Sequence, residues 1–235
     1  MQRYFVSNEL YNETYAHIKE DYHHIKNVMR MHKEDKIIVC NESGSCFLGE
    51  IASFDNTTVL VNKVDEIRYT ELDIDVTIAI GLMNNKKMDL LVQKLTELGV
   101  RRIIPISMKR SIVKNKDSKI ERWKKIAKEA SEQSHRNLIP IIEEVTKLEK
   151  INIDNYEQCL FAYEKSNNKY TFRDSVLNND NILIVIGPEG GIDDSEVNFM
   201  KENNFIEVSL GKRILRAETA PLFVMSAVTY IKELG

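Results

Sequence analysis

After residue 75 the chain alternates between two hydrophobic patterns, one typical of buried strands and one typical of amphipathic helices. Residues 76–82 form a short apolar run that favours a strand. Between residues 88 and 98, apolar side chains recur at spacings of three and four and so share one helix face, and Gly99 then suits the left-handed end of that helix. Further strands are expected at 103–106, 158–162, 182–186 and 205–210, with a second helix over 120–130. Alternating strands and helices predict an α/β fold with a mainly parallel sheet.

The first seventy residues follow a different pattern. A helix is expected over 22–31, followed by short β-like runs at 36–40, 46–52 and 57–64 that are separated by turn signals. Short strands joined by tight turns favour a small β-barrel. The charged stretch 65–75 has no core pattern and is expected to be a linker. We therefore predict two domains, residues 1–70 and residues 74–235.

A glycine-rich turn, "IGPEGGIDDSE", follows the apolar run 182–186. Asp193 and Glu196 fit a capping box that would start the next helix. Ligands of open α/β sheets bind beyond the carboxyl ends of strands, and glycine lets them approach the backbone. On this motif alone, a plain strand-to-helix turn is an equal alternative. The spacing matches neither a Walker loop nor GxGxxG, so a phosphate site has little support.

A second stretch of this kind, "SLGKRILRAETAPL" at residues 209–222, follows the run 205–210. Two strand ends that each carry a glycine turn would form facing walls of one pocket. Their backbone groups and apolar side chains suit a flat heteroaromatic ring better than a polyphosphate.

Composition narrows the class of protein. The chain has 235 residues, is 43% hydrophobic and 29% charged, and has a net charge of −3, which fits a globular protein without a global polycationic character. No run is long enough for a membrane span, and the start lacks a signal-peptide pattern, so we expect a cytoplasmic protein. In that compartment the three cysteines are expected to be reduced, partly buried thiols. The five histidines form no ligand set, so no metal site is expected.

Several motifs resemble the SPOUT superfamily of RNA methyltransferases, and more narrowly the small-subunit methyltransferase E family, which methylates N3 of a uridine in bacterial 16S ribosomal RNA. The matching stretches are "MQRYFV", "NVMRM", "KKMDLLVQKLTELGVRRIIPI", "EASEQSHRNLIPII", "IGPEGGI" and "LGKRILRAETAPL", which together span nearly the whole chain. Two positions depart from the family pattern. His135 stands where a small residue is usual, and Glu34 replaces a frequent glycine.

The resemblance implies a PUA-like barrel followed by a methyltransferase domain with a deep trefoil knot. It also implies that S-adenosylmethionine lies between the two glycine-bearing stretches, where small Ala217 and Ala220 would let the threaded chain pack tightly. The expected cofactor-binding residues are Ile186, Gly187, Pro188, Glu189, Gly190, Gly191, Leu210, Gly211, Ile214, Leu215 and Ala220.

Methyl transfer to N3 of uracil needs alignment of the two reactants and help with a weakly acidic proton. Arg216 is expected to stabilise the developing uracil anion, because a guanidinium stays charged and offers directed donors. A salt bridge to Glu218 or to another carboxylate is the alternative role for Arg216. Glu189 and Glu218 are candidate bases, and capping of a helix N-terminus is the alternative role for either carboxylate.

The expected RNA-binding residues lie in both predicted domains. Residues 101–136 contain twelve lysines and arginines against four acidic residues, which favours phosphate contact over a merely solvated helix face. The residues chosen are Arg3, Arg30, Arg110, His135, Arg136 and Asn137. The expected partners are 16S ribosomal RNA, with the small ribosomal subunit as its expected setting, and a second copy of the chain packed against an apolar last helix near 219–234.

Two other functions share much of this pattern. A SPOUT methyltransferase acting on tRNA or on a ribose 2′-hydroxyl would have the same cofactor pocket. A non-catalytic RNA-binding assembly factor could use the same scaffold, although intact glycine stretches disfavour it.

Overall fold

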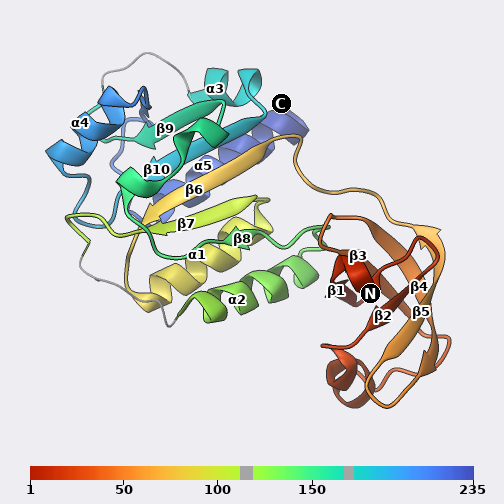
Figure 1. Ribbon diagram of the computed structural model, residues 1–235. Helices are drawn as coiled ribbons and strands as arrows, with labels where there is room; N and C mark the ends of the chain where they lie inside the picture. Colours follow the sequence, from red (N-terminus) through yellow and green to blue (C-terminus); the bar gives the residue numbers. More distant parts are fainter. Residues whose placement is uncertain (112–118, 167–171) are drawn as a thin grey trace. The chain divides into compact units, whose positions relative to one another are not determined.

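The computed structural model describes residues 1–111, 119–166 and 172–235, which fall into two units. Unit 1 contains Met1–Glu71 together with Ser131–Ile139, and unit 2 contains Leu72–Ala130 together with Pro140–Gly235. The later segment that joins unit 1 is not part of the predicted first domain. Figure 1 shows both units with the chain coloured along its length.

Unit 1 is built on a five-stranded sheet in the order β1-β3-β4-β5-β2. Its strands are β1 (Arg3–Val6), β2 (Tyr15–Ile18), β3 (Lys36–Asn41), β4 (Cys46–Phe54) and β5 (Val59–Glu66). Strands β1 and β3 are parallel, and the other pairs are antiparallel. The outer strands β1 and β2 also contact each other, so the sheet curves around a core that includes Tyr4, Ile37, Val39, Phe47 and Val61.

Unit 2 is built on a six-stranded, wholly parallel sheet in the order β11-β9-β10-β6-β7-β8. Its strands are β6 (Asp75–Gly81), β7 (Arg102–Ile106), β8 (Ile141–Ile142), β9 (Gln158–Ala162), β10 (Asn181–Ile186) and β11 (Ile206–Val208). The predicted parallel α/β sheet is therefore confirmed. The central strands β6 and β10 are buried after their first residues, as expected where helices cover both faces of a parallel sheet.

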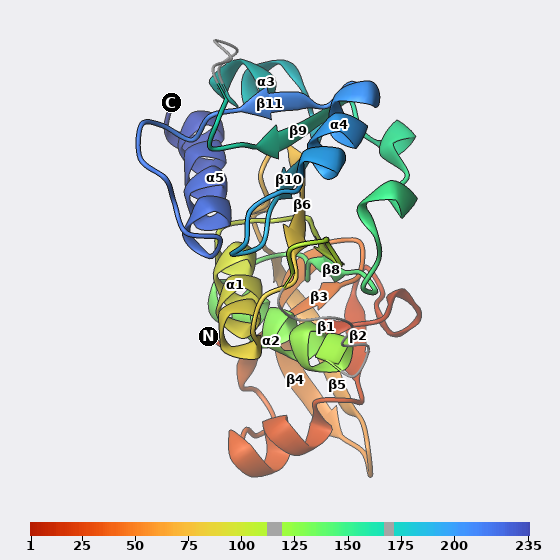
Figure 2. The ribbon, with the colours of Figure 1, turned by 90° about the vertical axis from the view of Figure 1, so that its left-hand side faces the viewer.

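Helices cover the two faces of this sheet. They are α1 (Asn85–Glu97), α2 (Ile120–Gln133), α3 (Phe172–Asn178), α4 (Asp194–Glu202) and α5 (Thr219–Thr229). Figure 2 shows α1 and α5 on one side of the sheet and α4 on the other. Val197 and Met200 of α4 share a core cluster with Ala79, Leu183 and Val185, which alternate along their strands. None of the helices in the described residues is long and apolar enough to cross a membrane.

Short helical turns complete the described chain. They are η1 (Asn8–Leu10), η2 (His24–Val28), η4 (Leu148–Lys150), η5 (Ile153–Asn155) and η6 (Tyr230–Leu234), of which η2 and η6 are π-helical. The helix expected over 22–31 is wrong in its extent. Arg30 has a φ of 52°, a left-handed conformation that ends the helical segment early.

Local signals in the sequence agree with the structure at several helix ends. Gly99 has a φ of 89° directly after the α1 C-cap, and Asp193 and Glu196 form the expected capping box of α4. Glu34 and His135 have φ values of 76° and 60°. This left-handed backbone explains why glycine suits position 34 better, since any Cβ is unfavourable in that conformation.

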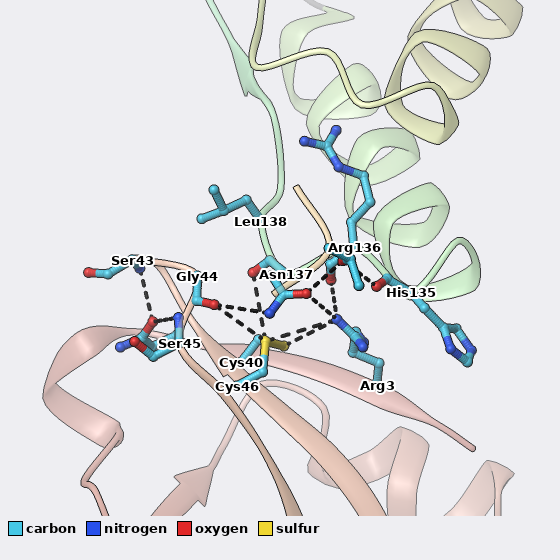
Figure 3. The surroundings of a disulfide bond; sticks show 12 residues. Arg3, Cys40, Ser43, Gly44, Ser45, Cys46, His135, Arg136, Asn137 and Leu138 are labelled. Atoms are coloured by element: carbon cyan, nitrogen blue, oxygen red, sulfur yellow. Dashed lines mark hydrogen bonds between the residues drawn. A yellow bond between two sulfur atoms is a disulfide. The ribbon is translucent and has the colours of Figure 1, made fainter. Parts of the chain in front are cut away.

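Two of the three cysteines form a disulfide, so the expectation of three reduced thiols is wrong. Cys40 is the last residue but one of β3 and Cys46 is the first of β4, and the two residues face each other in the sheet register with their Cα atoms 4.1 Å apart. Figure 3 shows this bond among the side chains of unit 1. The sequence spacing did not indicate this disulfide, because Cys40 and Cys46 come into contact only when β3 pairs with β4. Cys159 remains a free, buried thiol.

We predict that protein denatured without reductant has one reactive thiol per chain. Only a thiolate reacts with a thiol reagent. The two sulfurs of the disulfide therefore do not react until the disulfide is reduced. Burial raises the pKa of the native Cys159 thiol to about 11, so this thiol reacts fully only after unfolding. Chromogenic thiol titration gives the count, and a reduced, desalted sample that gives three is the control. Three thiols before reduction would contradict the assignment.

Candidate functional site

A cavity of unit 2 lies at the carboxyl ends of β9, β10 and β11. It has a volume of about 630 Å³ and is lined by segments that follow all three strands. Every residue that the sequence analysis assigned to the cofactor lines this cavity, and so do the three assigned to catalysis: Ile186, Gly187, Pro188, Glu189, Gly190, Gly191, Leu210, Gly211, Ile214, Leu215 and Ala220, with Arg216 and Glu218. The two glycine-bearing stretches therefore lie against one space.

The first wall of the cavity is the turn after β10. Gly191 has a φ of 73°, and its N–H donates to the Pro188 carbonyl over 2.9 Å, which closes the turn. A Cβ on Gly81, at the end of the neighbouring β6, would lie 2.5 Å from the Pro188 nitrogen. A Cβ on Gly190 would lie 2.8 Å from the Arg110 carbonyl oxygen. Glycine is therefore required at both positions, and this wall is close-packed from behind.

The second wall is the segment 209–218, between β11 and α5. Gly211 has a φ of 112°, and its N–H donates to the Ser209 hydroxyl over 3.3 Å. Nothing lies within 4 Å of the Cβ position on this glycine, so its role here is conformational rather than steric. The side chain of Ile214 is 82% exposed beside the cavity. An exposed large apolar side chain at a cavity favours contact with an apolar ligand surface.

Three charged side chains form a cluster at the cavity. The Lys87 ammonium lies 3.1 Å from a Glu189 carboxylate oxygen and 3.1 Å from a Glu218 carboxylate oxygen. A hydrogen bond from its own backbone N–H and a second one from Lys87 hold the pKa of the Glu218 carboxyl below its ordinary value. The nearby positive charge of Arg216 acts in the same direction. Glu218 is therefore a weaker base than a free glutamate.

Arg216 lies at the edge of this cluster with its side chain exposed. Among the residues that the structure describes, no carboxylate forms a salt bridge with it. The alternative role of Arg216 as a salt-bridge partner of Glu218 is thus not the arrangement seen, and the guanidinium remains available to a ligand in the cavity.

Three of the six residues expected to bind RNA are buried in unit 1. Arg3 and Arg136 are 3% and 5% exposed, and Asn137 is 1% exposed. Figure 3 shows the Arg3 side chain donating to the Arg136 carbonyl and the Asn137 side chain donating to the Gly44 carbonyl. Arg136 forms an ion pair with the buried Glu71 carboxylate. These side chains hold the Ser131–Ile139 segment within unit 1, so they are not surface contacts.

The other three expected RNA-binding residues are exposed. Arg30 and His135 lie at the surface of unit 1, and Arg110 at the surface of unit 2 with its side chain 44% exposed. Arg110 lies behind the first wall, next to Gly190, and forms an ion pair with Asp193. Of the basic residues counted between 101 and 136, Lys114 and Lys116 lie outside the described residues.

Sequence reasoning missed several residues that line the cavity. Lys87 comes from the first turn of α1. Ala162 ends β9, and Tyr163 and Glu164 follow it. A signal for the β9 residues was present, since parallel strands place their carboxyl ends at one edge of a sheet. No local signal marked Lys87, because its partners are about a hundred residues or more away in the sequence. No cluster of metal-ligating side chains occurs in the part of the chain that the structure describes.

The cavity fits the methyl donor that the resemblance implies. Glycine backbone along both walls admits a flat ring, and Ile186, Ile214 and Leu215 offer apolar contact. The neighbouring carboxylates suit a ligand that carries a sulfonium and an ammonium charge. The small size of Ala220, buried at the cavity, leaves this space open.

Known proteins similar to this chain agree with this geometry. An RNA methyltransferase domain model matches residues 70–229, and an RNA methyltransferase PUA domain model matches residues 18–64. Ribosomal RNA small subunit methyltransferase E of Bacillus subtilis is 38% identical, over 100% of this chain and 98% of the relative. The Mesomycoplasma hyopneumoniae protein of the same name is 30% identical, over 96% and 98%. The Neisseria gonorrhoeae protein of that name, solved bound to S-adenosyl methionine, is 27% identical with a TM-score of 0.83 over 97% and 96%.

We predict that Arg136→Met destabilises unit 1 strongly. The substitution leaves the Glu71 carboxylate, itself 7% exposed, without its positive partner. Loss of one partner of a buried ion pair typically costs about 3–5 kcal/mol. Urea unfolding followed by fluorescence and circular dichroism would measure the loss. Arg110→Met removes an exposed arginine and is the control, with an expected change below about 1 kcal/mol. Equal stability of the two variants would contradict the structural role of Arg136.

Proposed function

The chain belongs to the ribosomal RNA small subunit methyltransferase E family of RNA methyltransferases, and from this membership we propose its reaction. It transfers a methyl group from S-adenosylmethionine to N3 of a uridine in 16S ribosomal RNA. The observation that carries the proposal is the single cavity onto which both glycine-bearing stretches open. Family membership supports the methyl donor as cofactor, and the cavity supports its proposed position at these strand ends.

The cofactor is held between the two walls in this proposal. Backbone groups of the first wall approach it closely, because Gly191 has no side chain and the Cβ position of Gly190 faces Arg110 behind the wall. Leu210, Ile214 and Leu215 of the second wall cover the opposite side. When bound, S-adenosylmethionine supplies a methyl group already activated by a sulfonium centre. The protein therefore has mainly to align the uridine with that group, an effect that can contribute roughly 7–11 kcal/mol.

Arg216 is the residue proposed to act on the uridine. The N3 proton has to pass to water before N3 can bond to the methyl carbon, and the loss of this proton places negative charge on the uracil ring. A guanidinium stabilises that charge without changing its own protonation. Glu189 and Glu218 remain beside it as anions bound to Lys87. We assign these carboxylates to the ion-pair cluster rather than to proton abstraction, since Lys87 occupies an oxygen of each.

The two-domain organisation stays part of the proposal. Residues 1–70 would form a PUA-like RNA-binding domain, and residues 74–235 the methyltransferase domain, with the segment Gly211–Arg216 threaded through a trefoil knot. Support comes from the PUA match and from the way this segment returns to the cavity after β11. Arg30, Arg110 and His135, which are exposed, remain the proposed RNA contacts. The ribosomal small subunit is the proposed setting of the substrate RNA.

A homodimer through the last helix is proposed from the same resemblance. The predicted helix 219–234 consists of α5 followed by η6, and its inner side is buried. Its other side exposes Phe223 and Tyr230, and Leu90 of the contacting helix α1 is exposed as well. A second copy of the chain would cover these apolar side chains.

We predict that the purified protein methylates N3 of one uridine in 16S ribosomal RNA that lacks this modification, whether free or in small subunits. Nuclease digestion and mass spectrometry would identify the product. Arg216→Ala should lower turnover at least about 100-fold, as removal of an oxyanion donor typically does, while calorimetry shows that S-adenosylmethionine still binds. Arg173→Ala, at an exposed arginine of α3 that does not line the cavity, is the control.

Two other outcomes would contradict the proposed reaction. Methylation of a ribose 2′-hydroxyl, or of tRNA in preference to 16S ribosomal RNA, would contradict the acceptor. RNA binding without methyl transfer would indicate a non-catalytic assembly factor.

We predict that Phe223→Asp shifts the protein from dimer to monomer, because a carboxylate would be buried without a partner in the interface. Light scattering coupled to size exclusion would measure the mass. Leu177→Asp, at a comparably exposed apolar residue of α3, should leave the dimer intact. A monomeric wild-type protein would contradict the proposed assembly.

A further inference from the structure

We propose that Lys87 is a positioning residue for methyl transfer, which fixes the spacing of the two cavity walls by binding Glu189 of one wall and Glu218 of the other. This inference rests on the proposed function, because the spacing matters only if the cavity holds the methyl donor. The observation behind it is one ammonium nitrogen that lies 3.1 Å from a carboxylate oxygen of each wall.

The helix that carries Lys87 provides a fixed anchor. Asn84 caps α1, and its side chain accepts a hydrogen bond from the Lys87 N–H over 3.1 Å. One and four residues later, Met88 and Leu91 are buried in the core of unit 2. The backbone of Lys87 is therefore set by a helix cap and a packed helix face, so its side chain holds the two loops against a rigid element.

The two carboxylates come from segments with no other ion pair between them in the described residues. Glu189 lies in the turn after β10, and Glu218 lies at the N-terminal end of α5. The side chains of Lys87, Glu189 and Glu218 are 30%, 23% and 19% exposed, so they are partly shielded from solvent. Without the ammonium, two carboxylates would face each other across a short gap and repel. The expected consequence is separation of the walls.

Loss of Lys87 would also change the surroundings of Arg216. Glu218 lies close enough to Arg216 for the guanidinium to lower the pKa of this carboxyl. In the structure Glu218 bonds to Lys87 instead, which leaves the Arg216 guanidinium open. Released from Lys87, Glu218 would be drawn to Arg216 and would neutralise the charge that is proposed to act on the uridine. Lys87 therefore affects cofactor affinity through wall spacing and turnover through Arg216.

The two hydrogen bonds to Glu218 and Glu189 raise the pKa of Lys87, so the ammonium is charged at any pH where the protein works. The lowered pKa of Glu218 keeps this pair charged until the pH falls below the ordinary carboxyl range. The cluster is thus a constant feature at neutral pH and not a switch.

We predict that Lys87→Met weakens S-adenosylmethionine binding about five- to tenfold, as expected for two partly exposed ion pairs, and also lowers kcat. Lys87→Arg should restore the affinity to within about twofold. Calorimetry measures the dissociation constant, and the methylation assay measures kcat. Lys86→Met, at the exposed neighbour on the same helix, is the matched control and should bind like the wild type.

A double variant separates positioning from a general structural role. In Lys87→Met/Glu218→Gln the repelling carboxylate is also gone, so this protein should bind the cofactor better than Lys87→Met alone. Additive losses would overturn the inference, as would a lower urea midpoint for Lys87→Met that accounts for its weaker binding. Unchanged binding in Lys87→Met would overturn it while leaving the proposed function intact. If the wild-type protein itself bound no S-adenosylmethionine, the proposed function would fail first.

Discussion

Parallel pairing of β9, β10 and β11 is the constraint on which the rest of the site depends. Val185 of β10 is in register with Phe161 of β9, and Val208 of β11 with Ala162. These pairings bring three carboxyl ends to one edge of the sheet, although the strands are separated in the sequence by long connections. Because ligand sites of open α/β sheets lie beyond that edge, the segments after these strands share one cavity.

The two walls of that cavity are held by different forces. The first wall is fixed by close packing. A Cβ on Gly81 would clash with Pro188, and a Cβ on Gly190 would clash with the Arg110 backbone. The second wall has open space at Gly211 and an exposed Ile214, so packing does not fix its position. Ion pairs hold the second wall instead, because Lys87 binds both Glu218 of the second wall and Glu189 of the first. A rigid wall and an ion-paired wall together suit a pocket that must admit and release a cofactor at each turnover.

Local patterns in the sequence predicted the parts of the molecule that local physics determines. The spacing of apolar residues predicted α1, the capping box predicted the start of α4, and the glycine turns predicted both cavity walls. Local patterns could not predict the features that depend on contacts between distant parts of the sequence. Strand pairing creates the disulfide, and folding of Ser131–Ile139 onto unit 1 buries Arg136, which the sequence presents as one more basic residue in a positive stretch.

A crystal structure of the protein with S-adenosylmethionine bound would test the central claim most directly. The account predicts that the cofactor lies between residues 187–191 and residues 210–216, with the transferable methyl group facing the side of the cavity that carries Arg216. A cofactor bound elsewhere on unit 2, or one in contact with only one of the two segments, would contradict it.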